Sequence, residues 1–129
     1  MDPARLKAIP LFADLSDAER AQVARWADEV EVDEGRHLVD EGKFAYEFFV
    51  IEEGTAAVKH GDEVIAELGP GDFFGEIALL EHVRRTASVV ATSPMRAVVM
   101  FGRDFRSMET EIPAVADRIT RAVEERKRK

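Results

Sequence analysis

Residues 74 to 91 have the sequence Phe-Gly-Glu-Ile-Ala-Leu-Leu-Glu-His-Val-Arg-Arg-Thr-Ala-Ser-Val-Val-Ala. The segment begins with Gly75 and Glu76 at a predicted helix start, continues through a short apolar turn and two arginines, and ends in a β-rich run. A glycine at a helix N-terminus lets an anion approach backbone N–H groups that have no partner inside the helix. A glutamate there can accept hydrogen bonds from sugar hydroxyls, and an arginine further along can fold back to pair with a phosphate. The segment therefore contains the groups needed to hold a small sugar phosphate.

Residues 74–80 and 85–89 closely resemble the phosphate-binding cassette of cyclic nucleotide-binding domains. This family includes catabolite-activator-type regulators, regulatory parts of cyclic-nucleotide-dependent kinases, and cyclic-nucleotide-gated channels. Outside the cassette, the places of the family's β-roll glycines are matched by Gly35, Gly42, Gly54 and the Gly69-Pro70-Gly71-Asp72 turn. The resemblance covers nearly the whole chain. It implies a mainly β fold, an antiparallel β-roll or jelly roll (a double-stranded β-helix), with N-terminal helices and with C-terminal hinge and lid helices.

The residue pattern predicts the same order of elements. Ser16 and Glu19 form a capping box that predicts a helix over residues 16–28. Short β-type runs then alternate with glycine-rich and aspartate-rich turns, which is typical of an antiparallel barrel, sandwich or jelly roll. These predicted strands are residues 30–32, 37–39, 47–52, 55–60, 63–68, 86–91 and 96–101.

Helical periodicity returns after Gly102, and Pro113 suits the first turn of a last helix. One face of that helix would be apolar, formed by Val115, Ile119, Ala122 and Val123. We therefore expect a single domain over residues 1–129. It would consist of a helical segment (1–29), a β-roll (30–102) that contains the cassette (74–89), and C-terminal helices (103–129).

Composition limits the classes of function. A chain of 129 residues with a net charge of −8 suits one compact domain and disfavours nonspecific binding to DNA or to an anionic membrane. There is no cysteine for a disulfide or a thiolate metal site, no apolar run long enough to span a bilayer, and no secretory signal. The sequence predicts a cytoplasmic protein, or a cytoplasmic domain of a larger one, that binds neither nucleic acid nor membrane by itself.

The resemblance implies roles for two charged residues of the cassette. Glu76 would bind the ribose hydroxyl, and Arg85 would pair with the cyclic phosphate. Outside this motif, Glu76 would be interpreted as a first-turn carboxylate that complements the helix dipole, and Arg85 as a solvated surface arginine. With residues 86–89 placed on the family's strand, the phosphate position falls on Arg85. Arg84 would then face solvent, because neighbours along an extended segment face opposite ways.

The other predicted ligand-binding residues are less specific. Thr86 could reach a phosphate oxygen or a guanine edge, or could equally be a strand threonine. Val58 and Leu68 would line the base pocket or belong to the core of the roll. Arg126 falls where several channel-type relatives carry an arginine that folds over the base. The predicted set is completed by the cassette residues Phe74, Gly75, Ile77, Ala78 and Ala87.

The sequence favours a sensor domain without catalytic activity, which signals by moving its C-terminal helices. The ligand would be cAMP in preference to cGMP, with no other cofactor, and the last helix could dock on a second copy of the chain or on an effector. A cupin-like metal enzyme is disfavoured because the three histidines, His37, His60 and His82, lack ligand spacing. An orphan interaction module would usually have lost the glutamate or the arginine. A transcription factor would need a helix-turn-helix after Lys129.

Overall fold

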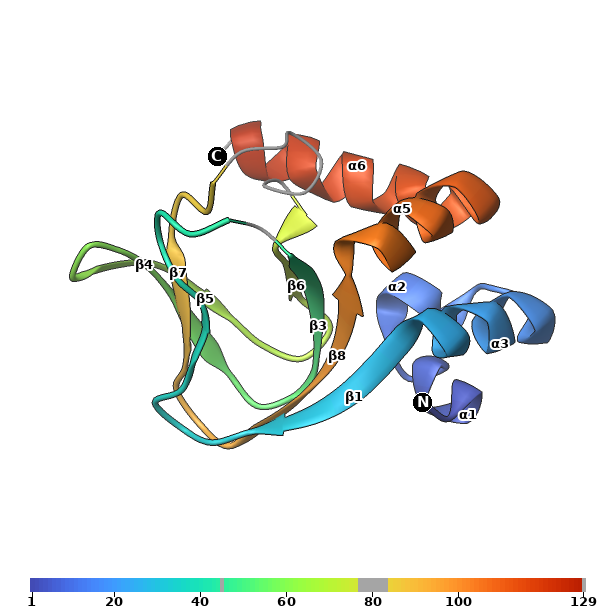
Figure 1. Cartoon of the computed structure of the whole chain (residues 1–129), viewed down its shortest axis with the longest axis horizontal. Helices are drawn as coiled ribbons and strands as arrows, with labels where there is room; N and C mark the ends of the chain where they lie inside the picture. Colours follow the sequence, from blue (N-terminus) through green and yellow to red (C-terminus); the bar gives the residue numbers. More distant parts are fainter. Residues whose placement is uncertain (45, 77–83, 129) are drawn as a thin grey trace.

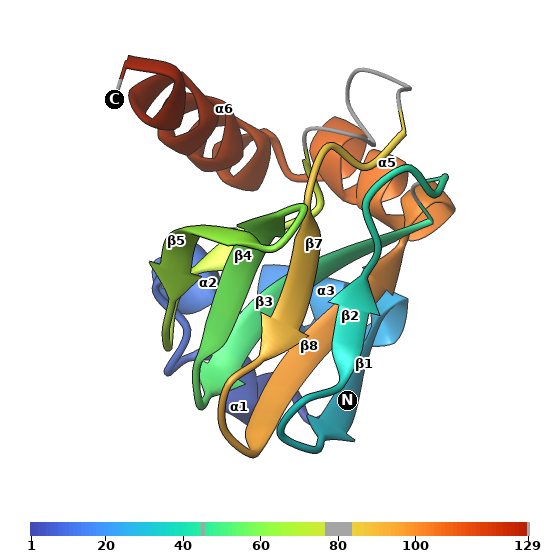
Figure 2. The same cartoon turned by 90° about the vertical axis from the view of Figure 1, so that its left-hand side faces the viewer.

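The structure is a computed structural model that describes residues 1–44, 46–76 and 84–128. Its strands form two four-stranded antiparallel sheets. The first sheet has the order β1-β8-β3-β6, formed by β1 (Ala27–Val32), β8 (Met95–Phe101), β3 (Glu47–Glu53) and β6 (Phe73–Phe74). The second has the order β2-β7-β4-β5, formed by β2 (His37–Val39), β7 (Ser88–Ala91), β4 (Ala56–His60) and β5 (Glu63–Leu68). Figure 2 shows the second sheet in front of the first, and the predicted antiparallel β-roll is confirmed.

Helices flank the roll at both ends of the chain. They are α1 (Pro3–Leu6), α2 (Pro10–Ala13) and α3 (Asp17–Trp26) before the roll, and α5 (Gly102–Glu111) and α6 (Pro113–Arg128) after it. Figure 1 shows α1, α2 and α3 on the side of β1 and β8, with α5 and α6 above them. Within the described residues, no helix combines the length and the apolar character that crossing a bilayer requires.

The start of α3 was predictable, but its end was not. The Ser16 hydroxyl accepts from the Glu19 N–H at 3.1 Å, and the Glu19 carboxylate accepts from the Ser16 N–H at 3.0 Å, so the predicted capping box is confirmed. The predicted helix extended to residue 28, which is wrong. Ala27 and Asp28 already belong to β1 and pair with β8. Pairing with a distant strand here outweighs helical propensity, which is only a weak local preference.

Most strand predictions agree with the structure within one or two residues, and α6 begins at the predicted Pro113. The exceptions are β1, which begins three residues early for the reason just given, and β6, which was not predicted. β6 contains only Phe73 and Phe74, and a two-residue strand has no periodicity that a pattern could detect.

The central strands of the first sheet, β3 and β8, are buried on both faces. Along β3, Phe48 and Val50 pack into a cluster with the helices, whereas Phe49 and Ile51 pack into the interior of the roll. Successive side chains of a strand point to opposite faces, so an unbroken apolar run is what a sheet covered on both sides requires. The sheet therefore separates a helical layer on one side from the apolar interior of the roll on the other.

Candidate functional site

A cavity of about 650 Å³ opens between the second sheet and the start of the cassette. This volume is in the range of small-molecule binding sites, roughly 300–1,000 Å³. Its charged side chains come from the cassette, and most of the remaining wall is apolar. The lining residues are Val39, Val58, Ile65, Ala66, Leu68, Phe73, Phe74, Gly75, Glu76, Arg85, Thr86, Ala87 and Val89.

Arg85 is the buried cation of this cavity, with 7% of its surface exposed. Its Nη1 donates to the Gly75 carbonyl at 2.8 Å, and its Nη2 donates to the Glu47 carbonyl at 2.6 Å. These bonds join the segment before β7 to the cassette start and to the start of β3. They use two of the five N–H donors of a guanidinium, so within the described residues further donors remain for an anion.

The charge of Arg85 is balanced by nearby carboxylates. Burial lowers the pKa of Arg85, and the negative charges of Glu47 and Glu76 act in the opposite direction. A guanidinium stays protonated in proteins because its ordinary pKa is so high. The cavity therefore contains a permanent cation with little water around it, where a charge-assisted hydrogen bond to a phosphate is strong.

Glu76 is almost fully buried, with 1% of its surface exposed. A carboxylate that only complemented a helix dipole at the surface would be solvated. Burying an ionised carboxylate is costly unless polar groups or an opposite charge compensate for it, and Arg85 is close enough to sense its charge. The structure thus brings the two charged residues that the sequence singled out into one buried site.

Gly75 is required by the geometry around Arg85. Its φ of +95° lies in the left-handed region, where residues with a Cβ are strained. A Cβ at this position would lie 2.7 Å from the Glu47 carbonyl oxygen and 2.9 Å from Arg85 Nη1. The sequence suggested that this glycine lets an anion approach the backbone. The structure shows that the missing side chain of Gly75 also leaves space for the guanidinium of Arg85.

The two adjacent arginines face opposite ways, as the alternation predicts. Arg84 is exposed, its guanidinium lies 4.4 Å from the centre of the Phe44 ring, and its Nη1 donates to the Gly42 carbonyl at 3.2 Å. Arg85 instead points into the cavity. This difference gives a matched pair of substitutions for testing the site.

The other predicted site residues fall into two groups. Val58, Leu68, Phe74, Thr86 and Ala87 all line the cavity. Val58 and Leu68 are half-buried and also pack on the core of the roll, so both of their proposed roles are compatible with one position. The predictions that lie outside the described part of the chain concern the residues Ile77 and Ala78 and the side chain of Arg126.

Sequence reasoning missed several lining residues, namely Val39, Ile65, Ala66, Phe73 and Val89. Ile65 is 56% exposed although it is large and apolar, and the neighbouring Val64 is exposed as well. Exposed apolar residues are common on protein surfaces, so the pattern alone could not select it. Among the described residues, no three histidine, cysteine, aspartate or glutamate side chains come together as metal ligands would.

Comparison with known proteins places this geometry in a family. Residues 29–111 match the family described as the cyclic nucleotide-binding domain. A cAMP-dependent protein kinase regulatory subunit of Mycosarcoma maydis is 35% identical over 122 residues, which covers 88% of this chain and 23% of the relative. A candidate potassium channel protein of Rhodopseudomonas palustris is 33% identical over 121 residues, covering 92% of this chain and 29% of the relative. The structure of cAMP-bound PfPKA-R matches with a TM-score of 0.86 at 27% identity, covering 98% of this chain and 44% of that one.

The chain spans about a quarter of the length of the curated relatives that it matches. The matched residues nevertheless include most of the roll, the whole described part of the cassette, and α5. Since the match extends over most of this chain and includes the buried Glu76 and Arg85, the chain belongs to the cyclic nucleotide-binding domain family.

Proposed function

We propose that this chain is a regulatory domain that binds a cyclic nucleotide, cAMP in preference to cGMP, and that it catalyses no reaction. The observation that carries the proposal is that Glu76 and Arg85 are both buried at one cavity of about 650 Å³ whose other walls are mainly apolar. A cyclic nucleotide has matching parts: an anionic phosphate, a ribose hydroxyl and a flat base.

The three parts of the ligand can each be assigned a place. The cyclic phosphate lies against Arg85, whose plane is fixed by two backbone carbonyls. The ribose hydroxyl donates to Glu76, and the base packs against the side of Val58 and Leu68. An apolar wall binds a base by packing without reading its edge, so discrimination between adenine and guanine must come from polar groups such as Thr86. The preference for cAMP is supported by the names of the relatives and by the cAMP bound to PfPKA-R.

The output of the domain is proposed to pass through α6. Val115, Ile119 and Val123 of this helix are buried in the helical cluster. Arg118 donates to the carbonyls of Pro10 and Leu11 at 3.2 and 3.1 Å and forms an ion pair with Asp14 at 2.7 Å. Ligand binding would shift the population of α6 between this docked position and others, by as much as the ligand prefers one state. Its partner would then be an effector domain or protein, or a second copy of the chain.

Direct binding is the first test. Calorimetric titration with cAMP is expected to give micromolar or tighter affinity, about −8 kcal/mol or better. Ligand at about a hundred times its dissociation constant should raise the free energy of unfolding by about 2.7 kcal/mol. Linear 5′-AMP is the control, since it has the same base and sugar without the ring-closed phosphate, and it should bind more weakly. A melting temperature that does not change with cAMP or cGMP at millimolar concentration would contradict the proposal.

Thr86 is exposed at the cavity wall, so its hydroxyl is available to a ligand. If the hydroxyl contacts guanine, Thr86→Ala should weaken cGMP binding more than cAMP binding, by about 0.5–1.5 kcal/mol for a neutral hydrogen bond. The matched variant Thr86→Ser retains the hydroxyl and should keep the original ratio of the two affinities. Equal losses for both nucleotides would instead indicate a phosphate contact, and no loss would indicate a strand residue without a ligand role.

A further inference from the structure

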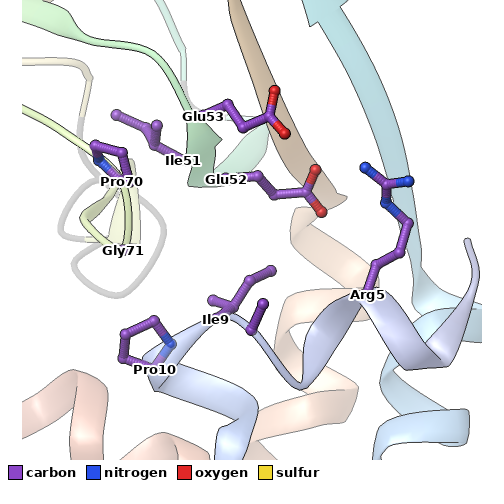
Figure 3. A pocket seen from close by; sticks show the side chains of 9 residues that line it. Arg5, Ile9, Pro10, Ile51, Glu52, Glu53, Pro70 and Gly71 are labelled. Carbon is purple, nitrogen blue, oxygen red and sulfur yellow. The ribbon is translucent and has the colours of Figure 1, made fainter.

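A second cavity, of about 390 Å³, lies between the N-terminal helices and the first sheet, away from the proposed ligand site. One side is formed by Arg5, Ile9 and Pro10, and the other by residues of β3 and by the turn at Pro70 and Gly71 (Figure 3). Figure 3 shows the side chain of Glu52 extending toward Arg5. The N-terminal segment thus meets the roll at this point across a gap, instead of through a continuous apolar contact.

The strand register brings a second carboxylate to the same place. Glu29 of β1 and Val50 of β3 both pair with Val98 of the intervening β8, so their side chains share the helix-facing side of the sheet. Glu52 lies at an irregularity in the pairing of β3 with β8, between Ile51 and Glu53, and its side chain extends toward Arg5 and hydrogen-bonds to Glu29. Arg5 of α1 reaches across the gap, and its Nε lies 2.7 Å from Glu29 Oε2.

The two carboxyl groups are shielded from water. Both oxygens of Glu52 and Oε2 of Glu29 have almost no solvent contact, and apart from the Arg5 Nε contact to Glu29 Oε2 no N–H or hydroxyl group of the described residues donates to them. Two buried carboxylates repel each other unless one of them holds a proton and donates it to the other. Burial, together with the hydrogen bond to Glu29, raises the pKa of Glu52 to about 7. The hydrogen bond that Glu52 donates to Glu29 lowers the pKa of Glu29, and the positive charge and hydrogen bond of Arg5 act in the same direction.

We propose that Arg5, Glu29 and Glu52 form a pH-sensitive clasp, in which one proton shared by the two glutamates holds the N-terminal helices on the roll. With the proton in place, the two carboxyl groups carry one negative charge, which Arg5 balances. Without it, they carry two. Arg96 of β8 also faces the pair, but it is engaged with Glu31 at 2.9 Å. The neighbouring Glu53 is exposed, so its negative charge is solvated.

The direction of the pH effect follows from the raised pKa of Glu52. An acid whose pKa is higher in the folded state than in the unfolded state stabilises the fold at low pH, and this contribution is lost as pH rises through the folded pKa. For Glu52 the loss occurs between its ordinary 4.5 and about 7. The lowered pKa of Glu29 acts in the opposite sense only below its ordinary value. Near neutrality, rising pH therefore loosens the clasp.

The clasp has a route to α6. The same N-terminal segment contains α2, whose first two residues, Pro10 and Leu11, supply the carbonyls that accept from Arg118. A change in the stability of the contact between α1 and the sheet would therefore affect α6, the helix that we propose as the output element. The clasp itself does not depend on that proposal, because it concerns groups outside the ligand cavity.

Hydrogen exchange of the N-terminal amides tests the clasp without any ligand. The amides of Arg5, Lys7, Ile9 and Phe12 donate within this segment. After correction for intrinsic exchange, their protection should fall by about tenfold between about pH 6 and about pH 8, since each pKa unit corresponds to a factor of ten. Glu52→Gln places a neutral donor beside Glu29 at both pH values and should abolish the change. The matched control Glu53→Gln removes the same charge from the next residue, which is exposed, and should retain it.

Two results would overturn the clasp. One is wild-type protection that is equal at both pH values, and the other is loss of the pH response in Glu53→Gln as well. Carbon-13 NMR titration of the glutamate carboxyl carbons in the wild-type protein is independent of how any variant folds. It should show one buried carboxyl group titrating near 7, as the pair predicts. If Glu29 and Glu52 both titrated at their ordinary values, no proton would be shared and the proposal would fail.

Discussion

Replacing Arg85 with alanine is expected to weaken cyclic nucleotide binding by about 30-fold or more. Removing one partner of a buried charged pair costs about 2–5 kcal/mol, because the other charge stays buried without compensation. Here the phosphate would lose the one buried guanidinium among the cavity-lining residues that the structure describes. Titration calorimetry of wild type and variant measures the change directly.

The neighbouring arginine provides the control for this experiment. Arg84→Ala removes the same charge from the next residue, but that side chain is exposed and rests on Phe44. An exposed charge contributes little to affinity, on the order of 1 kcal/mol or less, so the loss should be several-fold at most. Because Arg85 also joins two backbone carbonyls, the melting temperature of each variant must be measured alongside. Similar losses for the two variants would show that Arg85 has no special role in binding.

Gly75→Ala is expected to have the second largest effect, although it changes no charge. The new methyl group would lie within 3 Å of both the Glu47 carbonyl oxygen and Arg85 Nη1, so the guanidinium must move away from its carbonyl partners. We expect affinity to fall by about tenfold or more, because a displaced donor loses much of a charge-assisted hydrogen bond. The free energy of unfolding should also fall, by about 1–3 kcal/mol for the strained backbone.

Gly35→Ala separates the two causes. Gly35 has nearly the same backbone angle, a φ of +89°, but a Cβ there would meet nothing within 4 Å. This variant should therefore lose stability by about 1–2 kcal/mol from the left-handed backbone alone and should bind the nucleotide normally. Thermal melting and titration of both variants distinguish crowding at Arg85 from strain in the chain. Normal binding by Gly75→Ala would show that the glycine serves only the turn.

The sequence was most informative where a function depends on neighbouring residues in the chain. Glu76 and Arg85 lie in one continuous segment with a recognisable order, so their burial in a common site could be anticipated. The orientation of Arg84 and Arg85 followed from simple alternation along an extended segment. The division into a single domain and the use of α6 as a signalling element stay predictions.

The sequence was least informative where distant segments meet. Glu29 and Glu52 each look like ordinary charged strand residues in the sequence, and only the pairing of β1 and β3 with the intervening β8 brings them together. The end of α3 failed for the same reason, because Ala27 is drawn into β1 by its pairing with Met100. Such contacts depend on strand pairing over long separations, which no local pattern specifies.

The double-sided burial of β3 has a consequence for how the molecule unfolds. The side chains of Phe48 and Val50 complete one core while those of Phe49 and Ile51 complete the other, and β8 contributes to both in the same way. Neither core can therefore be dismantled without exposing the apolar side chains that serve its neighbour. The central strands make the helical layer and the ligand-binding roll one cooperative unit, as expected of small domains. We therefore expect a ligand that stabilises the roll to stabilise the distant helical layer as well, through the strands that both cores share.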